Sequence, residues 1–239
     1  MNAPIKFWSY SALKRFEKCA YEIYLDRVMK NPKPEIVETS PLERGNRVHK
    51  AAEAYVKGEG QLVGELGIFA SEFERLKEAY GTGTVQVEDS WWFKRDWSES
   101  DWEDPDKWAI IKCDVVEWVS QTHMDVTDWK TGKSFGNEVS HDQQMMLYAI
   151  AAFMKYAALN TVRVKLGYLD EAPPIAAKIT TDRKSPYSLN DSPHEVRSSW
   201  TLWRSRQDLV NPRANTAVSD LTTEALVPAR TVSSCERSS

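Results

Sequence analysis

The sequence lacks the features of exported and membrane-embedded proteins. Its 239 residues contain no run approaching the roughly 18 consecutive apolar residues of a membrane-spanning helix. It opens with MNAPIKFWSY, which lacks the apolar core of a signal peptide, so we expect no export. The three cysteines, Cys19, Cys113 and Cys235, are too few and too widely spaced for a disulfide framework, which favours a reducing cytoplasm.

The composition is that of an ordinary globular protein, with 41% hydrophobic and 28% charged residues. The formal net charge of -4 argues against simple coating of nucleic acid. The charge is uneven, however, because residues 1–57 hold 11 basic and 7 acidic side chains, whereas the other 182 residues hold 20 and 28. A basic surface can therefore exist on a chain that is acidic overall.

Hydrophobic spacing predicts a mixed α/β domain. Apolar residues at helical intervals predict helices over residues 11–29, 41–57, 62–80, 139–159 and 195–210. Alternating patterns predict strands at 85–88, 108–119, 124–130 and 162–168, with the tryptophan-rich, acidic segment 91–107 as a hairpin connection or an insertion. The helix at 41–57 has the strongest start signal, because Ser40 can cap it, Pro41 suits its first turn and Glu43 completes a capping box.

We expect one domain over residues 1–210, followed by an irregular or mobile tail over 211–239. The domain would comprise N-terminal helices (9–80), a sheet core (84–170) and a C-terminal helix (about 195–210). Runs of adjacent strands between helices favour a mixed sheet over a Rossmann alternation.

Two predicted strands carry a set of charged residues suited to phosphodiester hydrolysis. Asp128 and Lys130 are two residues apart and so share one sheet face. If the hairpin pairs symmetrically about Gln121, Asp114 faces Asp128. Paired carboxylates suit Mg²⁺, which can polarise a phosphodiester and acidify the attacking water, while a lysine orients that water or the phosphate.

A structural alternative is that these are ordinary exposed strand residues, with Lys130 as a cross-strand ion-pair partner. Aspartate is disfavoured in strands, so Asp114 and Asp128 at facing positions require a reason. We expect two neighbouring residues, His123 and Asp125, to lie on the solvated surface of the turn.

Separated motifs resemble those of the RecB-like branch of the PD-(D/E)XK nuclease superfamily, in that branch's order, over about residues 8–170. These are the S-Y-S-x-L-x-x-F-x-x-C stretch at 9–19, the G-x-x-x-H helix at 45–49, the aspartate strand at Asp114, the D-x-K-T-G strand at 128–132 and the Q-x-x-x-Y helix at 144–148. The resemblance implies a restriction-endonuclease-like core, a mixed sheet flanked by helices in the order α-β-β-β-α-β. The periodicity predicts the same order.

The resemblance also implies roles for individual residues. Asp114, Asp128, the backbone carbonyl of Trp129 and His49 would bind one Mg²⁺ or Mn²⁺ ion. Lys130 would be the catalytic lysine. A lone histidine on an amphipathic helix is otherwise more often structural.

Further residues have supporting roles by the same resemblance. Gln144 and Tyr148, on one helix face, would contact DNA or support the site. Glu88 is a weaker candidate, since many of these nucleases place another acid on that strand. Arg44 and Arg47 are also weaker candidates, for tracking phosphates, because charged runs are more often solvated surface.

The chain departs from its relatives at the cysteines. Ala20 follows Cys19 where the family often has proline, and the only late cysteine is Cys235. Relatives that hold an iron–sulfur cluster use four thiolates, so we expect no iron–sulfur cluster here and a packed side chain at Cys19.

The expected function is a Mg²⁺- or Mn²⁺-dependent exonuclease that processes linear single- or double-stranded DNA ends for recombination, repair or phage DNA processing. We expect a cytoplasmic setting, bacterial or that of the host of a phage, and no membrane partner. The chain has no P-loop motif, so a helicase, single-strand-binding or annealing protein would be a separate partner.

Two alternatives remain open: a catalytically weak module of the same fold that binds DNA ends, and a structure-specific endonuclease. The joint presence of Asp114, Asp128 and Lys130 argues against the first. The signals at His49 and at Gln144 to Tyr148 favour the RecB-like branch over the second.

Overall fold

The computed structural model describes residues 5–31, 40–171 and 175–182. The helix predicted at 195–210 and the tail predicted at 211–239 lie outside these residues. None of the described helices is long and apolar enough to cross a membrane.

The chain divides into two compact units. The smaller comprises Met1–Ile5, Lys14–Lys30 and Asn190–Ser239, and the larger comprises Lys6–Leu13 and Asn31–Leu189. The single helix predicted over 11–29 is wrong, because the backbone of Cys19 is extended (φ -157°, ψ 101°). Its place is taken by α1 (Tyr10–Lys18), α2 (Ala20–Ile23) and the π-helix η1 (Tyr24–Val28).

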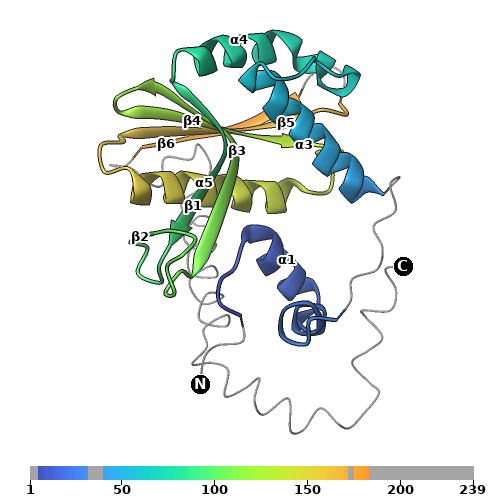
Figure 1. The fold of residues 1–239 in the computed structure, drawn as a ribbon, viewed down its shortest axis with the longest axis vertical. Helices are drawn as coiled ribbons and strands as arrows, with labels where there is room; N and C mark the ends of the chain where they lie inside the picture. Colours follow the sequence, from blue (N-terminus) through green and yellow to red (C-terminus); the bar gives the residue numbers. More distant parts are fainter. Residues whose placement is uncertain (1–4, 32–39, 172–174, 183–239) are drawn as a thin grey trace, which may run out of the picture. The chain divides into compact units, whose positions relative to one another are not determined.

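The larger unit is built on a six-stranded mixed sheet in the order β2-β1-β3-β4-β5-β6 (Figure 1). Its strands are β1 (Val85–Phe93), β2 (Glu99–Ser100), β3 (Ala109–Ser120), β4 (His123–Lys130), β5 (Thr161–Tyr168) and β6 (Ile175–Asp182). β4 and β5 are parallel, and the other neighbours are antiparallel. The predicted order of helices, three strands, a helix and a strand is confirmed, with β2 and β6 as additions.

Helices α3 (Pro41–Lys57) and α4 (Ala70–Gly81) lie on one face of the sheet and α5 (Glu138–Lys155) on the other (Figure 1). The predicted Ser40 cap of α3 is confirmed: the Ser40 side chain accepts from the Glu43 amide at 3.2 Å, and Gly58 ends the helix with φ 79°. The helix predicted at 62–80 instead begins as the 3-10 helix η2 (Gly64–Phe69).

The first residues of the tryptophan-rich segment 91–107 belong to the sheet. Trp91 and Phe93 are fully buried, so β1 extends through residues that we expected in a connection. The Trp92 ring packs edge-on against Phe7 and Trp102. Trp91 therefore belongs to the core and not to the protein surface.

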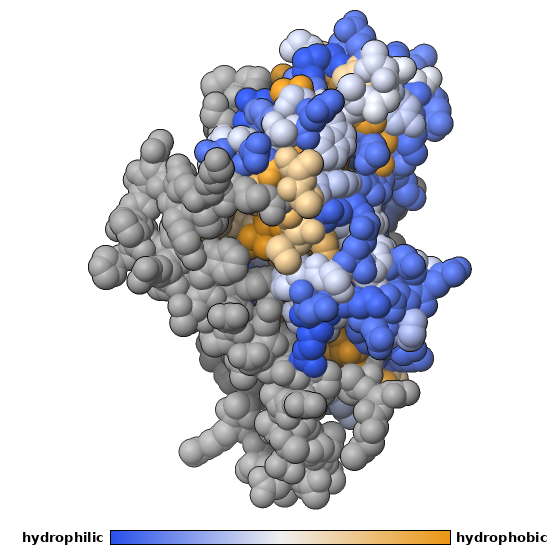
Figure 2. All heavy atoms as spheres, turned by 90° about the vertical axis from the view of Figure 1, so that its left-hand side faces the viewer, coloured by the Kyte–Doolittle hydropathy of each residue, from blue (hydrophilic) through white to orange (hydrophobic). Residues whose placement is uncertain are grey.

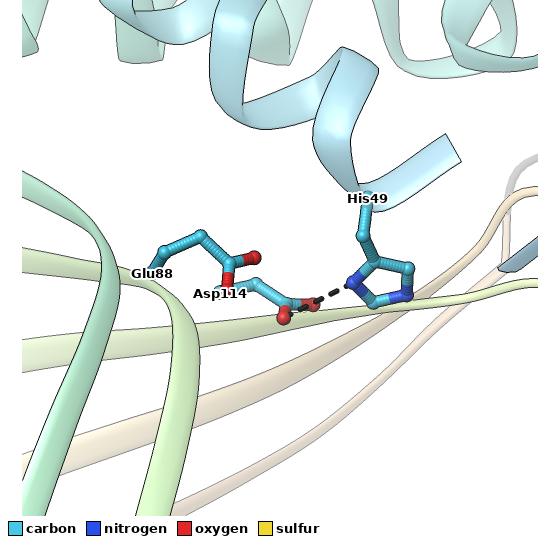
Figure 3. A group of neighbouring side chains, drawn as sticks. All are labelled: His49, Glu88 and Asp114. Carbon is cyan, nitrogen blue, oxygen red and sulfur yellow. Dashed lines mark ion pairs between the residues drawn. The ribbon is translucent and has the colours of Figure 1, made fainter. Parts of the chain in front are cut away.

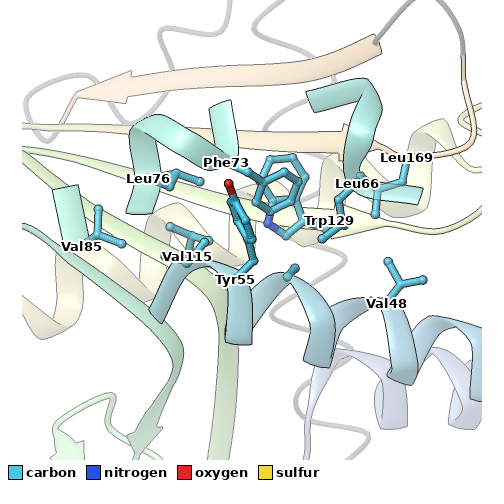
Figure 4. Packing of buried hydrophobic residues seen from close by; sticks show 11 residues of the cluster. Val48, Tyr55, Leu66, Phe73, Leu76, Val85, Val115, Trp129 and Leu169 are labelled. Atoms are coloured by element: carbon cyan, nitrogen blue, oxygen red, sulfur yellow. The ribbon is translucent and has the colours of Figure 1, made fainter. Parts of the chain in front are cut away.

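The core between α3, α4 and the sheet contains Trp129 (Figure 4). Its ring lies 4.6 Å from the ring of Phe73 and 5.4 Å from that of Phe69. Gly167 pairs with Trp129 across β4 and β5, and a Cβ atom there would lie 2.4 Å from the indole. Only glycine leaves room for this packing, which fixes the backbone between Asp128 and Lys130.

Among the described residues, the side of the molecule drawn in Figure 2 is mostly polar. Figure 2 shows one side of the molecule, on which hydrophilic residues predominate among those described and a smaller group of hydrophobic residues is exposed.

A buried ion-pair network at the start of β4 contradicts the expected solvated turn. Asp125 is 2% exposed, and its carboxylate accepts from Arg163 Nε at 3.0 Å and pairs with Lys165 Nζ at 3.0 Å. His123 is half-buried, with Nε2 3.2 Å from Asp125 Oδ1. Arg163 and Lys165 of β5, which are distant in sequence, therefore neutralise the charge of Asp125 and make its burial possible.

We predict that Asp125→Asn lowers the free energy of unfolding by about 3 kcal/mol, because it leaves two partly buried cations without their counter-charge. Burial alone would raise the pKa of Asp125, but Arg163 and Lys165 outweigh it and hold the pKa below its usual range. The contribution is therefore present above the unfolded pKa and is lost as the pH falls through the lower folded pKa.

Urea denaturation of the wild type and the variant, at neutral and acidic pH, measures the effect. Glu65→Gln is the control, since it breaks the exposed pair of Glu65 with Arg47 and should cost at most about 1 kcal/mol. Equal losses in the two variants would show that the Asp125 network does not stabilise the fold.

Candidate active site

His49, Glu88 and Asp114 come together from α3, β1 and β3 (Figure 3). One ligand atom from each lies within 4.8 Å of the others. His49 Nδ1 is 3.1 Å from Asp114 Oδ1. The three side chains line a cavity of about 10 Å³, room for roughly one water-sized particle. One imidazole and two carboxylates around such a space fit a single divalent cation.

The sheet is irregular where these side chains meet. The register of β1 and β3 skips the rung of Glu88 and Asp114. Glu88 has φ 52°, in the left-handed region that non-glycine residues seldom adopt. The amide of Trp129 donates to Asp114 Oδ2 at 2.7 Å. A side chain thus accepts this strand amide, and local backbone strain accompanies the cluster, as is common at functional sites.

The predicted register of the central hairpin is confirmed. Val115 pairs with Thr127 and Val116 with Val126, as symmetry about Gln121 requires. Pairing stops at Val115, one residue short of the rung that would join Asp114 to Asp128. The two aspartates are therefore near each other but have different partners.

Asp128 belongs to a second group, which faces α5. Its Oδ1 accepts from Tyr148 Oη at 2.6 Å and from Gln144 Nε2 at 3.2 Å, and its Oδ2 lies 2.7 Å from Lys130 Nζ. Lys130 Nζ also donates to Gln144 Oε1 at 2.8 Å. Gln144 thus connects the lysine to the aspartate. Tyr148 is 4% exposed, so its hydroxyl contacts Asp128 inside the protein, and its supporting role stays a prediction.

The two groups interact electrostatically. Burial raises the pKa of Asp128, and the negative charge of Asp114 raises it further, against the lowering effect of Lys130. Burial, then Asp114, also raises the pKa of Glu88. Burial lowers the pKa of His49, but its hydrogen bond to Asp114 and the nearby carboxylates outweigh this and raise it overall. The site has an excess of negative charge that a cation would relieve.

Arg44 and Arg47 each have a carboxylate partner. Both Nη atoms of Arg44 donate to Asp170, at 2.7 and 2.6 Å, and Arg47 pairs with Glu65 at 2.7 Å. Asp170 also accepts from the amide of Gly132 at 2.8 Å. In this structure Arg44 therefore fixes the loop after Lys130, and its phosphate contact stays a prediction.

One residue pair near the site was not predicted. His141 Nδ1 lies 2.7 Å from Tyr168 Oη, and Tyr168 is the β5 neighbour of Lys130. The spacing of three residues between His141 and Gln144 was the available signal, because it places both on one helix face.

A comparison with protein families agrees with this architecture. The family model of the PD-(D/E)XK nuclease superfamily matches residues 7–236. No curated protein is similar enough to count as a match. Solved structures that resemble the chain include a protein named SSO0001, 12% identical over 81% of each chain with a TM-score of 0.38. A candidate exonuclease from Eubacterium rectale is 14% identical, covers 86% of this chain and 83% of its own, and has a TM-score of 0.40.

We predict that His49→Ala weakens Mn²⁺ binding by about 10-fold or more, because it removes the one nitrogen donor of the cluster. The matched control is Lys50→Ala, the next residue of α3, which is exposed. Metal binding requires the neutral imidazole, and the pKa of His49 is raised. Wild-type affinity should therefore fall as the pH drops through and below that raised pKa, and should fall less in His49→Ala.

Isothermal titration calorimetry with Mn²⁺ at several pH values measures both effects. Equal Mn²⁺ affinities for wild type, His49→Ala and Lys50→Ala would assign His49 a purely structural role.

Proposed function

The chain belongs to the PD-(D/E)XK nuclease superfamily, and on this premise we propose that it is a Mg²⁺- or Mn²⁺-dependent exonuclease that hydrolyses DNA from the ends of linear molecules. The observation that carries the proposal is the cluster of His49, Glu88 and Asp114 beside the Asp128–Lys130 pair. The first group suits a divalent cation and the second a reacting phosphate.

The residues of the site would have two separate roles in hydrolysis, cation binding and phosphate positioning. A divalent cation held by His49, Asp114 and Glu88, with Asp128 and the Trp129 carbonyl as further ligands, would polarise the phosphodiester and acidify the attacking water. Lys130 is partly exposed, so its ammonium can donate to a phosphate oxygen or to that water. The water loses a proton as its oxygen bonds to phosphorus, one phosphorus–oxygen bond to a sugar breaks, and the departing sugar oxygen takes up a proton.

Gln144 and Tyr148 act as positioning residues. Gln144 accepts from Lys130 and donates to Asp128, so the lysine and the carboxylate keep a fixed relation. Tyr148 donates to the same Asp128 oxygen and accepts from Gln144 at 2.9 Å. Both come from α5, one helical turn apart, and this rigid support keeps Lys130 directed at the reacting group.

Specificity for ends follows from what the site can contact. Its carboxylates, lysine and amide suit phosphate and metal, and phosphate contacts carry no sequence information. Selection must then come from how a strand end reaches Lys130. The activity fits recombination, repair or phage DNA processing in a bacterial or host cytoplasm, beside a helicase, single-strand-binding or annealing protein.

We predict that linear DNA is degraded while covalently closed duplex circles survive, when both are incubated with the purified protein in Mg²⁺ or Mn²⁺. Lys130→Ala should bind ends but cut at least about 100-fold more slowly, because the cation ligands remain while phosphate positioning is lost. Lys155→Ala, at the far end of α5, is the control and should cut like wild type. Efficient cutting of closed circles would favour an endonuclease, and tight end binding without cutting would favour a DNA-binding module.

We also predict that Tyr148→Phe lowers the cleavage rate by about 10-fold with little change in melting temperature, because the ring still packs while Asp128 loses a donor. Tyr80→Phe on α4 removes a hydroxyl far from Asp128 and serves as the control. Single-turnover rates on an end-labelled strand provide the measurement, and unchanged rates in Tyr148→Phe would remove its hydroxyl from the catalytic arrangement.

A further inference from the structure

The loop between β4 and α5 carries the most exposed large hydrophobic side chain of the described residues. Phe135 is 87% exposed, more than Val139 (72%) or any other. A single exposed apolar residue is common on protein surfaces and means little alone. Its significance depends on how the loop is held and where it lies.

The loop is fastened at several points, so exposure of Phe135 does not result from a loose backbone. The Gly132 amide donates to Asp170 at 2.8 Å, and the Ser134 hydroxyl donates to Glu171 Oε2 at 3.0 Å. Within the loop, Asn137 Nδ2 donates to the Lys133 carbonyl at 3.2 Å. Arg44 in turn holds Asp170 through two hydrogen bonds. The exposed ring of Phe135 thus lies on a loop that several hydrogen bonds hold in place.

The loop also lies close to the reacting group. Phe135 follows Lys130 by five residues, so their Cα atoms are at most about 18 Å apart. At 3.4 Å per stacked nucleotide, this is about five nucleotides of a strand. Lys133, two residues before Phe135, is exposed as well. An exposed aromatic ring beside a lysine is the combination that binds single strands, since bases stack on the ring and the cation attracts phosphate.

We propose that Phe135 is a base-stacking subsite for an unpaired strand, within about five nucleotides of the phosphodiester at Lys130, with Lys133 contacting the backbone. The subsite rests on the proposed nuclease function and adds a preference for unpaired nucleotides near the cut. Stacking is indifferent to base identity, so the subsite holds a strand without reading its sequence.

The test measures binding of fluorescent single-stranded oligonucleotides by anisotropy in the Lys130→Ala background with Mg²⁺, so that strands stay intact. One abasic position is moved through the first several nucleotides. We expect one position at which the missing base weakens binding by about 5-fold or more, and Phe135→Ala should remove that dependence. Phe135→Trp should keep it and Phe135→Leu should lose it, because a planar ring and not apolar area is needed.

Val139→Ala is the matched control, since it removes another exposed apolar side chain from the start of α5 and should leave binding unchanged. Thermal melting checks that each variant is folded. Abasic profiles that are the same with and without Phe135, or binding of duplex but not single strands, would overturn the subsite. Unchanged oligonucleotide binding with an altered sedimentation coefficient in Phe135→Ala would instead assign the ring to a contact between copies of the chain, and would also overturn it.

Cleavage of an unmodified strand by the otherwise wild-type protein is measured in parallel. Absence of cleavage of both this strand and a linear duplex would contradict the proposed nuclease function itself. Cleavage by that protein, together with no effect of Phe135→Ala on binding, would contradict the subsite alone.

Discussion

Repulsion between carboxylates is the constraint around which this site is organised. Asp114 raises the pKa of both Glu88 and Asp128, in each case adding to the effect of burial. The fold keeps the charges in place with fixed donors: the Trp129 amide for Asp114, and Tyr148 with its neighbours for Asp128. Such clustering of like charges costs stability, and a divalent cation bound there would relieve that cost. The same clustered carboxylates that lower stability would thus be the ligands of the cation.

The packing of Trp129 determines which way the side chains of Asp128 and Lys130 point. Successive side chains of a strand alternate between faces, so burying Trp129 against Phe73 turns Asp128 and Lys130 toward α5. Gly167 makes this packing possible, because any side chain there would collide with the indole. Burial of Trp129 on one face of the sheet therefore orients the Asp128 and Lys130 side chains on the other face.

The sequence predicts the parts of this structure that local chemistry controls. The start of α3 follows from Ser40 and its capping box, and the hairpin register follows from symmetry about Gln121. Features that depend on residues distant in the sequence are not predicted. Asp125 is buried because Arg163, nearly 40 positions later, supplies its counter-charge. Likewise, periodicity places Glu88 on a strand but gives no sign of its left-handed backbone.

The central claim is that His49, Glu88 and Asp114 hold one divalent cation next to Lys130. Anomalous diffraction from crystals grown with Mn²⁺ tests it most directly, because the peak locates the ion without reference to activity. One strong peak is expected within bonding distance, about 2.0 to 2.3 Å, of the His49 nitrogen and of the Glu88 and Asp114 oxygen atoms. A peak bound elsewhere, or none at saturating Mn²⁺, would contradict it.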